Sequence, residues 1–329
     1  MKRLWFATGL LAAATVVQAQ RPAADSSDFP SRPIRVVVPS AAGGGTDIVA
    51  RLIGQALTEA WGQTLVVDNR GGAGGLPAVA LVARQSAADG YTMLVGSNGH
   101  VSFAPALYRK LPYDPQKDLA PASLIANQTF VVAASHSLPA ASFQEFLSLA
   151  RKNPGKFSYG SGGLGSASHL GTELMRQVAG FDLLHVPYKG TGPGTAAIMA
   201  GEIHILLVGL ATVLPHVRNK SDKIKALAVT SGKRSPAAPD IPTAVEAGLP
   251  GYEFDVWYGM VLPGGVPPAV LGRTSNEIVR LMKTPALRER FAAAGLDPIG
   301  STAAAFADQL KREIPIWRRV VKEANIAVD

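Results

Sequence analysis

The chain contains two glycine-rich turns, and each lies between a short apolar segment and a helical pattern. The first turn is Gly43-Gly44-Gly45-Thr46-Asp47, which follows the apolar run Ile34–Val38; the second, residues 160–166, follows residues 157–159. A turn of this kind leaves backbone N–H groups unpaired at the positive end of a helix dipole, where an anion is favoured. Two such turns far apart in the sequence predict two lobes that close on one small anionic ligand.

Strand and helix patterns alternate around the first turn. Apolar runs predict the strands, and the segments between them carry apolar residues at helical spacing. The expected strands are residues 34–38, 65–67 and 92–95, and the expected helices are residues 47–61 and 76–85. This order is typical of a parallel sheet with helices on both faces, so we expect an α/β fold.

The pattern restarts after the apolar segment 124–134. The elements expected there are helices at 142–152, 166–179 and 195–200, strands at 157–159, 183–186, 203–208 and 224–229, an extended segment at 253–262, and three closing helices at 267–283, 285–294 and 302–324. We expect the chain to cross between two lobes twice, near residues 128–132 and 233–241. The turns at the strand ends of both lobes would then face one cleft. We therefore expect lobe 1 to comprise residues 30–129 and 240–329, and lobe 2 residues 130–239.

Residues 1–19 are expected to be a secretory signal peptide. Lys2 and Arg3 form a basic start, an apolar stretch too short to span a bilayer follows, and Val17-Gln18-Ala19 offers a cleavage point. The sequence contains no Cys, which excludes disulfides and thiolate metal sites. The net charge of +8 favours anionic partners, but the 7% aromatic content and the lack of a Lys/Arg block argue against nucleic acid.

Motifs of several other chemistries are incomplete or missing. Residues 160–165 match the dinucleotide fingerprint G-x-G-x-x-G, but the next expected strand ends in Pro187-Tyr188-Lys189 rather than in the acidic residue that a ribose needs. No Ser lies in a G-x-S-x-G nucleophile elbow, and the six His residues lack metal-ligand spacing. We expect no cofactor, no metal and no catalytic residue.

Several polar side chains near the turns are candidate ligand contacts, each with a plain structural alternative. Asp47 either fixes its turn through hydrogen bonds and a water, or accepts an ammonium group, or is simply an acid favoured at a helix start. His169 either faces the ligand or packs and caps its helix. Ser97 and Asn98 follow a strand and either contact the ligand or form a plain turn.

The same ambiguity applies to residues further along the chain. Lys189 lies in a corresponding loop of the second lobe, or is solvated at its rim, and Trp257-Tyr258 either pack in the core or line the cleft. The full candidate set for ligand binding is Gly43, Gly44, Gly45, Thr46, Asp47, Ser97, Asn98, Ser161, Gly163, Gly165, Ser166, His169 and Lys189.

Motifs along nearly the whole chain resemble those of Bug-type receptors, the substrate-binding proteins of tripartite tricarboxylate transporters. The matching segments are residues 33–39, 42–47, 67–75, 89–92, 111–115, 153–156, 185–190, 226–230 and 247–252. The resemblance implies a type II periplasmic-binding-protein fold, with two α/β lobes joined by a double crossover hinge. It also implies a carboxylate held between the two glycine turns, here residues 43–47 and 161–169. The apolar Gly209-Leu210-Ala211 departs from the family's polar residue in that loop and would tolerate an alkyl or aromatic group.

The expected function is that of a periplasmic solute receptor that binds a small carboxylate and delivers it to the membrane permease of a tripartite tricarboxylate-type system. The receptor is expected to be a monomer without catalytic activity. Two alternatives remain open, namely a ligand-responsive partner of a membrane sensor and an exported hydrolase.

Overall fold

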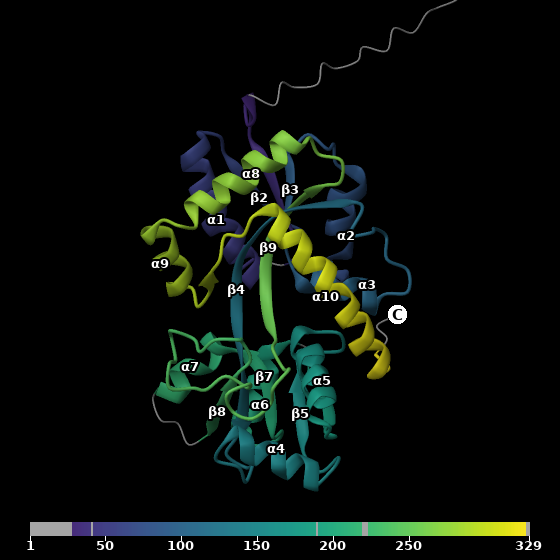
Figure 1. The fold of residues 1–329 in the computed structure, drawn as a ribbon, viewed down its shortest axis with the longest axis vertical. Coiled ribbons are helices and arrows are strands. Elements are labelled where there is room, and N and C mark those ends of the chain that lie inside the picture. Colours follow the sequence, from purple (N-terminus) through teal and green to yellow (C-terminus); the bar gives the residue numbers. More distant parts are fainter. Residues whose placement is uncertain (1–27, 41, 189, 219–222, 327–329) are drawn as a thin grey trace, which may run out of the picture.

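The computed structural model describes residues 28–40, 42–188, 190–218 and 223–326. The expected signal peptide and the candidate contact Lys189 lie outside these described residues. Figure 1 shows two lobes, one above the other, with long strands that run between them. None of the helices in the described part of the chain is long and apolar enough to span a membrane.

The upper lobe is built on a mixed sheet. Strand β1 pairs in parallel with β2 and β3, β9 pairs antiparallel with β3 and β4, and β10 adds to the far side of β4. The strands are β1 (Ile34–Val38), β2 (Leu65–Asn69), β3 (Thr92–Ser97), β4 (Leu119–Ser135), β9 (Asp255–Pro263) and β10 (Asp297–Pro298). The helices are α1 (Gly45–Trp61), α2 (Leu76–Ala80), α3 (Ala104–Leu107), α8 (Pro268–Leu281), α9 (Pro285–Ala293) and α10 (Ala303–Glu323).

The lower lobe repeats this plan. Strand β5 pairs in parallel with β6 and β7, and the end of β4 pairs antiparallel with both β7 and β8. The strands are β5 (Ser158–Ser161), β6 (Leu184–Pro187), β7 (Ile205–Gly209) and β8 (Ile224–Val229). The helices are α4 (Phe143–Lys152), α5 (Ala167–Ala179), α6 (Thr191–Ala200) and α7 (Leu210–Arg218).

Strand β4 carries the chain from one lobe to the other. Its residues up to Thr129 pair with β9, and from Phe130 onward they pair with β7 and β8. The chain returns beside this point, where the N–H of Thr230 donates to the carbonyl of Phe130 and the N–H of Phe254 donates to the carbonyl of Thr230, both at 2.9 Å. Two antiparallel crossings therefore connect the lobes, as expected of a double crossover hinge.

The return segment 241–254 contacts the lower lobe. The N–H of Ala244 donates to Val229 at 2.8 Å, and the hydroxyl of Tyr252 donates to the carbonyl of Gly171 at 3.1 Å. We therefore propose that lobe 2 extends to Phe254, instead of ending at residue 239 as the composition of the connector suggested.

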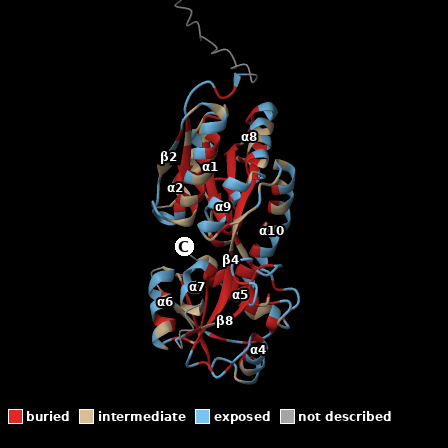
Figure 2. Cartoon of the chain, turned by 90° about the vertical axis from the view of Figure 1, so that its left-hand side faces the viewer, coloured by how far each residue is buried: buried red, intermediate tan, exposed pale blue. Residues whose placement is uncertain are grey.

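Burial follows the apolar patterns of the sequence. On α1, Val49, Ile53 and Leu57 are fully buried against the sheet, and each such side chain contributes about 1.5–3 kcal/mol of hydrophobic free energy. Figure 2 shows buried strands in both lobes and exposed outer faces on the helices.

The structure differs from the expected elements at several boundaries. Helix α6 begins at Thr191, before the expected residue 195, because Pro193 is tolerated in the first turn of a helix. The residues after β7 were expected to form a loop, but Leu210 begins helix α7 instead. The expected helix 76–85 contains α2 followed by a wider helical turn at Leu81–Gln85.

Candidate functional site

The first glycine turn presents the uncapped start of a helix. Gly44 is the N-cap residue of α1, and within the described residues no side chain caps that helix end. A helix start without a capping side chain leaves its first amides available to an acceptor from outside. Gly43 has a φ of +83°, a left-handed conformation that favours glycine. The turn thus leaves the first amides of α1 without a capping side chain.

The carboxylate of Asp47 fixes the conformation of this turn through hydrogen bonds. It accepts hydrogen bonds from the N–H of Gly43 at 2.9 Å, Nδ2 of Asn69 at 3.0 Å and Nε of Arg51 at 3.0 Å. Burial alone would raise the pKa of Asp47, but the hydrogen bonds from Arg51, Gly43 and Asn69 outweigh it and lower the pKa. With its side chain only 4% exposed, Asp47 positions the turn, and its oxygens already have donors.

The second glycine turn is bonded to its own side chains. Ser166 caps helix α5 by accepting the N–H of His169 at 3.3 Å. Three glycine amides of the turn also have internal acceptors: Gly162 donates to Ser168 Oγ at 2.8 Å, Gly163 to Ser161 Oγ at 3.1 Å, and Gly165 to His169 Nδ1 at 3.0 Å. Fewer free amides are therefore available here than the sequence pattern suggested.

Behind the second turn lies a stack of three rings. The ring centroids of His169 and His185 are 4.1 Å apart, and those of His185 and Tyr159 are 4.6 Å apart. Oγ of Ser161 lies 2.7 Å from Nε2 of His185, which joins the stack to the turn. Burial lowers the pKa of His169 to about 4, and the neighbouring His185 adds to this effect. His169 is therefore neutral at physiological pH, as its acceptor role toward Gly165 requires.

The last ring of the stack, Tyr159, bonds to an ion pair formed by Glu173 and Arg176. The hydroxyl of Tyr159 donates to Glu173, whose carboxylate also accepts from Nη1 of Arg176 at 2.6 Å and 2.8 Å. Burial, and then the hydrogen bond to Glu173, raise the pKa of Tyr159, so its hydroxyl stays protonated. Behind the second turn, the stacked and hydrogen-bonded side chains thus form one connected group, which we call the column: His169, His185, Tyr159, Glu173 and Arg176.

Ser97 and Asn98 connect the upper lobe to the crossing strands. Asn98 is buried, and its Nδ2 donates to the backbone carbonyl of Asp255 at 2.9 Å. Oγ of Ser97 lies 3.0 Å from Nδ1 of His100. Asn98 therefore bonds to the start of the returning strand β9, whereas the Ser97 side chain bonds within its own loop.

Asp255 itself lies at the start of β9, opposite Thr129. Burial raises the pKa of its carboxyl to about 8, with further contributions from Asp297 and Glu253. The carboxyl is therefore largely neutral at physiological pH, so it does not repel an anion at the hinge.

Tyr258 and Gln128, which are absent from the candidate set, link the first turn to the lower lobe. A Cβ added at Gly45 would overlap the hydroxyl of Tyr258. That hydroxyl donates to Oε1 of Gln128 at 2.8 Å, and a Cβ added at Gly209 would lie only 2.6 Å from Nε2 of Gln128. Of the two interpretations of Trp257 and Tyr258, packing in the core fits their burial, since they are only 3% and 5% exposed, although the hydroxyl of Tyr258 also lies beside Gly45.

A signal for these residues was present in the sequence. Asn127-Gln128-Thr129 interrupts an otherwise apolar run, and a polar interruption of a buried strand needs hydrogen-bond partners. The partner Tyr258 lies 130 positions along the chain. Only the crossing of β4 and β9 brings the two together.

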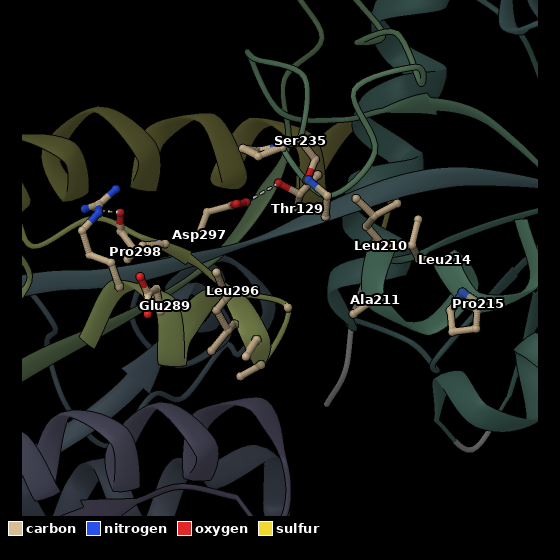
Figure 3. A pocket seen from close by; sticks show the side chains of 17 residues that line it. Thr129, Leu210, Ala211, Leu214, Pro215, Ser235, Glu289, Leu296, Asp297 and Pro298 are labelled. Carbon is tan, nitrogen blue, oxygen red and sulfur yellow. Dashed lines mark hydrogen bonds between the residues drawn. The ribbon is translucent and has the colours of Figure 1, made fainter. Parts of the chain in front are cut away.

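A cavity of about 770 Å³ opens between the lobes next to Thr129 (Figure 3). The start of α7 forms one wall, and α9 with β10 forms the other. At its base, the hydroxyl of Thr129 donates to Asp297 at 2.7 Å. Its lining includes Leu210 and Ala211, which directly follow Gly209, but neither glycine turn. The apolar residues Leu210 and Ala211, which stand where the family has a polar residue, therefore face a space large enough for a small organic molecule.

The chain resembles a described family over most of its length. The family model described as the tripartite tricarboxylate transporter family receptor matches residues 49–326. Protein BugT of Bordetella pertussis is 32% identical over 326 residues, which cover 99% of this chain and 98% of BugT.

Solved structures show the same fold. Rpa4515 of R. palustris, solved with adipate, is 34% identical with a TM-score of 0.77 and covers 91% of this chain and 99% of its own. MatC of Rhodopseudomonas palustris, solved with bound malate, is 33% identical with a TM-score of 0.73 and covers 89% of this chain and 100% of its own. The predicted periplasmic-binding-protein fold is thereby confirmed.

Proposed function

Because this chain belongs to the family of tripartite tricarboxylate transporter receptors, we propose that it is a periplasmic receptor that binds a small carboxylate between its lobes and delivers it to membrane permease subunits. The proposal includes no catalytic step, cofactor or metal, and it takes the receptor to be a monomer.

The observation that carries this proposal is the uncapped start of α1. No side chain caps its first amides, and Asp47 fixes the loop before them by accepting the N–H of Gly43. A hydrogen bond to a charged acceptor is worth about 1.5–3 kcal/mol, so a few amides could hold one carboxylate at about micromolar affinity after ordering costs. We propose that Gly44, Gly45 and Thr46 supply these donors.

The lower lobe has a different role in this proposal. Since the glycine amides of its turn are bonded internally, we propose that it presents the outer surface of residues 161–169 to the ligand when the lobes close. The body of the ligand then extends toward the apolar wall of Leu210, Ala211 and Leu214. A ligand that contacts both lobes favours the closed form by its difference in affinity for the two forms.

The two relatives solved with adipate and malate supply the first compounds to test. We expect at least one carboxylate in a panel of dicarboxylates, hydroxy acids and aromatic acids to raise the thermal midpoint of the purified protein. A ligand at a hundred times its dissociation constant stabilises a protein by about 2.7 kcal/mol. The uncharged diamide of each acid is the matched control.

Two results would contradict the proposal. One is a complete panel without any shift in the thermal midpoint. The other is an equal shift from an acid and its diamide, because the donors of α1 distinguish ligands by negative charge. Ligand-dependent retention of a permease subunit, rather than of a sensor protein, tests the delivery step.

A further inference from the structure

Helix α10 carries a cationic face that the proposed binding site does not use. Its buried side packs Phe306, Leu310, Ile314 and Trp317 into the core. Its exposed side carries the residues that we call the basic stripe: Lys311, Arg312, Arg318, Arg319 and Lys322. These positions repeat at helical spacing, so their side chains lie along one face.

The charges of this stripe are largely uncompensated. Lys311 pairs with Asp308 at 3.4 Å, whereas Arg312, Arg318, Arg319 and Lys322 have no ion pair with any described residue. Of the acids on α10, Glu313 is turned inward and accepts hydrogen bonds from Nε1 of Trp257 at 2.8 Å and of Trp317 at 2.9 Å, whereas Asp308 and Glu323 are exposed. The exposed part of α10 from Asp308 to Glu323 therefore carries five cationic side chains against two acidic ones, an excess of positive charge.

The helix contacts both lobes. It begins in the upper lobe, and Figure 1 shows it descending beside the hinge toward α5. Nε2 of Gln177, on α5, donates to the carbonyl of Val320 at 3.1 Å. The ring of Trp317 packs edge-on against Phe254, with centroids 5.7 Å apart, where the chain recrosses. The shape of the surface that a partner would contact here therefore depends on the relative orientation of the two lobes.

A hollow lined by both apolar and charged side chains adjoins the stripe. A cavity of about 510 Å³ lies between α10, α5 and the segment before β9, with Arg312 and Arg319 on its α10 side and Glu253 and Asp255 on the opposite side. Its apolar lining includes two exposed side chains, Ile316, which is 40% exposed, and Val178, which is 37% exposed. Protein interfaces often consist of an apolar side chain inserted into a pocket, with charged residues of complementary sign around it. Ile316, Val178 and the neighbouring cations could supply one half of such an interface.

We propose that the basic stripe and this hollow form the docking surface for an acidic, periplasm-facing segment of a membrane protein, with one apolar side chain of that segment inserted between Ile316 and Val178. The proposal rests on the proposed function, which supplies a membrane partner. A concave hollow favours a protein segment over an anionic lipid surface, which binds convex faces with protruding apolar side chains.

The experiment uses the absence of Cys from the sequence, which makes a single introduced thiol unique. The full mature chain with Ile316→Cys carries a photo-cross-linker on that thiol, and Val66→Cys, 52% exposed on β2 away from α10, is the matched control. Both are mixed with right-side-out membrane vesicles of the bacterium that produces the protein. Mass spectrometry identifies the cross-linked segment.

A charge reversal tests the stripe itself. The variant R312E/R318E/R319E/K322E is compared with K110E/K152E/K156E/K283E, which makes the same change in net charge at exposed lysines elsewhere. We expect cross-linking from position 316 to an acidic segment of an integral membrane protein, at least tenfold weaker after the stripe reversal and unchanged after the control reversal. Raising the salt concentration should also weaken it, because screening reduces attraction between exposed charges.

Three results would overturn the proposal. They are equal cross-linking after the stripe reversal, no cross-link from position 316, and binding that survives protease treatment of the vesicles and is reproduced by phosphatidylglycerol liposomes. The carboxylate panel is run on the same variants. If no carboxylate shifts any thermal midpoint but the stripe-dependent cross-link remains, the proposed function fails and the docking surface stands.

Discussion

The two glycine turns have similar sequences and lie in the same place between strand and helix, yet they are built differently. In the first turn the helix start lacks a capping side chain, and one buried carboxylate holds the loop from behind. In the second turn Ser161, Ser168 and His169 occupy the glycine amides. A glycine-rich pattern therefore indicates where amides gather, whereas neighbouring side chains decide whether those amides remain free for a ligand.

The largest effect is expected for Gly45→Ala in the first turn. Its Cβ would overlap the hydroxyl of Tyr258, so the turn must shift. We expect at least a hundredfold loss of carboxylate affinity by calorimetry and a loss of stability of about 1–3 kcal/mol, the usual cost of overpacking. Gly272→Ala, where an added Cβ meets no atom within 4 Å, is the control. Unchanged affinity in Gly45→Ala would remove the first turn from the site.

Asp47→Asn tests the support behind the first turn. Losing hydrogen bonds to a charged acceptor should lower the free energy of unfolding by about 1.5–3 kcal/mol at pH 7 in urea. Because the folded-state pKa is lowered, this contribution is present above the ordinary pKa of 3.8 and is lost as the pH falls through the folded-state value. Asp308→Asn, on the exposed face of α10, is the control. A variant as stable as the wild type would mean that Asp47 does not hold the turn.

His169→Gln tests the column behind the second turn. Since the folded-state pKa of His169 is about 4 against an ordinary 6.5, its contribution is fully present above pH 6.5 and is lost progressively toward pH 4. Wild-type stability should fall by roughly 1.4 kcal/mol for each pH unit in that window from this residue, and the variant should lack this slope. His136→Gln, at an exposed imidazole, should keep it. Urea titrations at a series of pH values would reveal identical slopes if the idea is wrong.

Ser168→Ala should have the smallest effect and sharpens the comparison most directly. It removes the acceptor of the Gly162 amide and should lower stability by about 1 kcal/mol while leaving carboxylate affinity within twofold of the wild type. Ser148→Ala, on the exposed face of α4, is the control. If Ser168→Ala weakens binding as strongly as Gly45→Ala, the two turns contribute alike and the contrast drawn between them is wrong.

Local patterns predicted the elements better than the contacts between them. The apolar runs at β1, β3 and β7 and the amphipathic spacing of α1 and α10 depend on residues close together in the chain, so they were recognisable. Helix α7 was missed because Gly209-Leu210-Ala211 carries no start signal, and its Pro215 reduces helix propensity. The hydrogen bond of Tyr258 to Gln128 beside the first turn was not predicted, because it joins strands far apart in the sequence.

The sequence by itself determined a two-lobed α/β chain, the positions of its glycine turns and its family, since these follow from periodicity, turn residues and ordered motifs. Only the tertiary structure decided which turn keeps free amides and where α10 spans the lobes. The reason is that a hydrogen bond depends on the position of both partners, and Asn69, Gln128 and His185 reach theirs only after distant strands have paired.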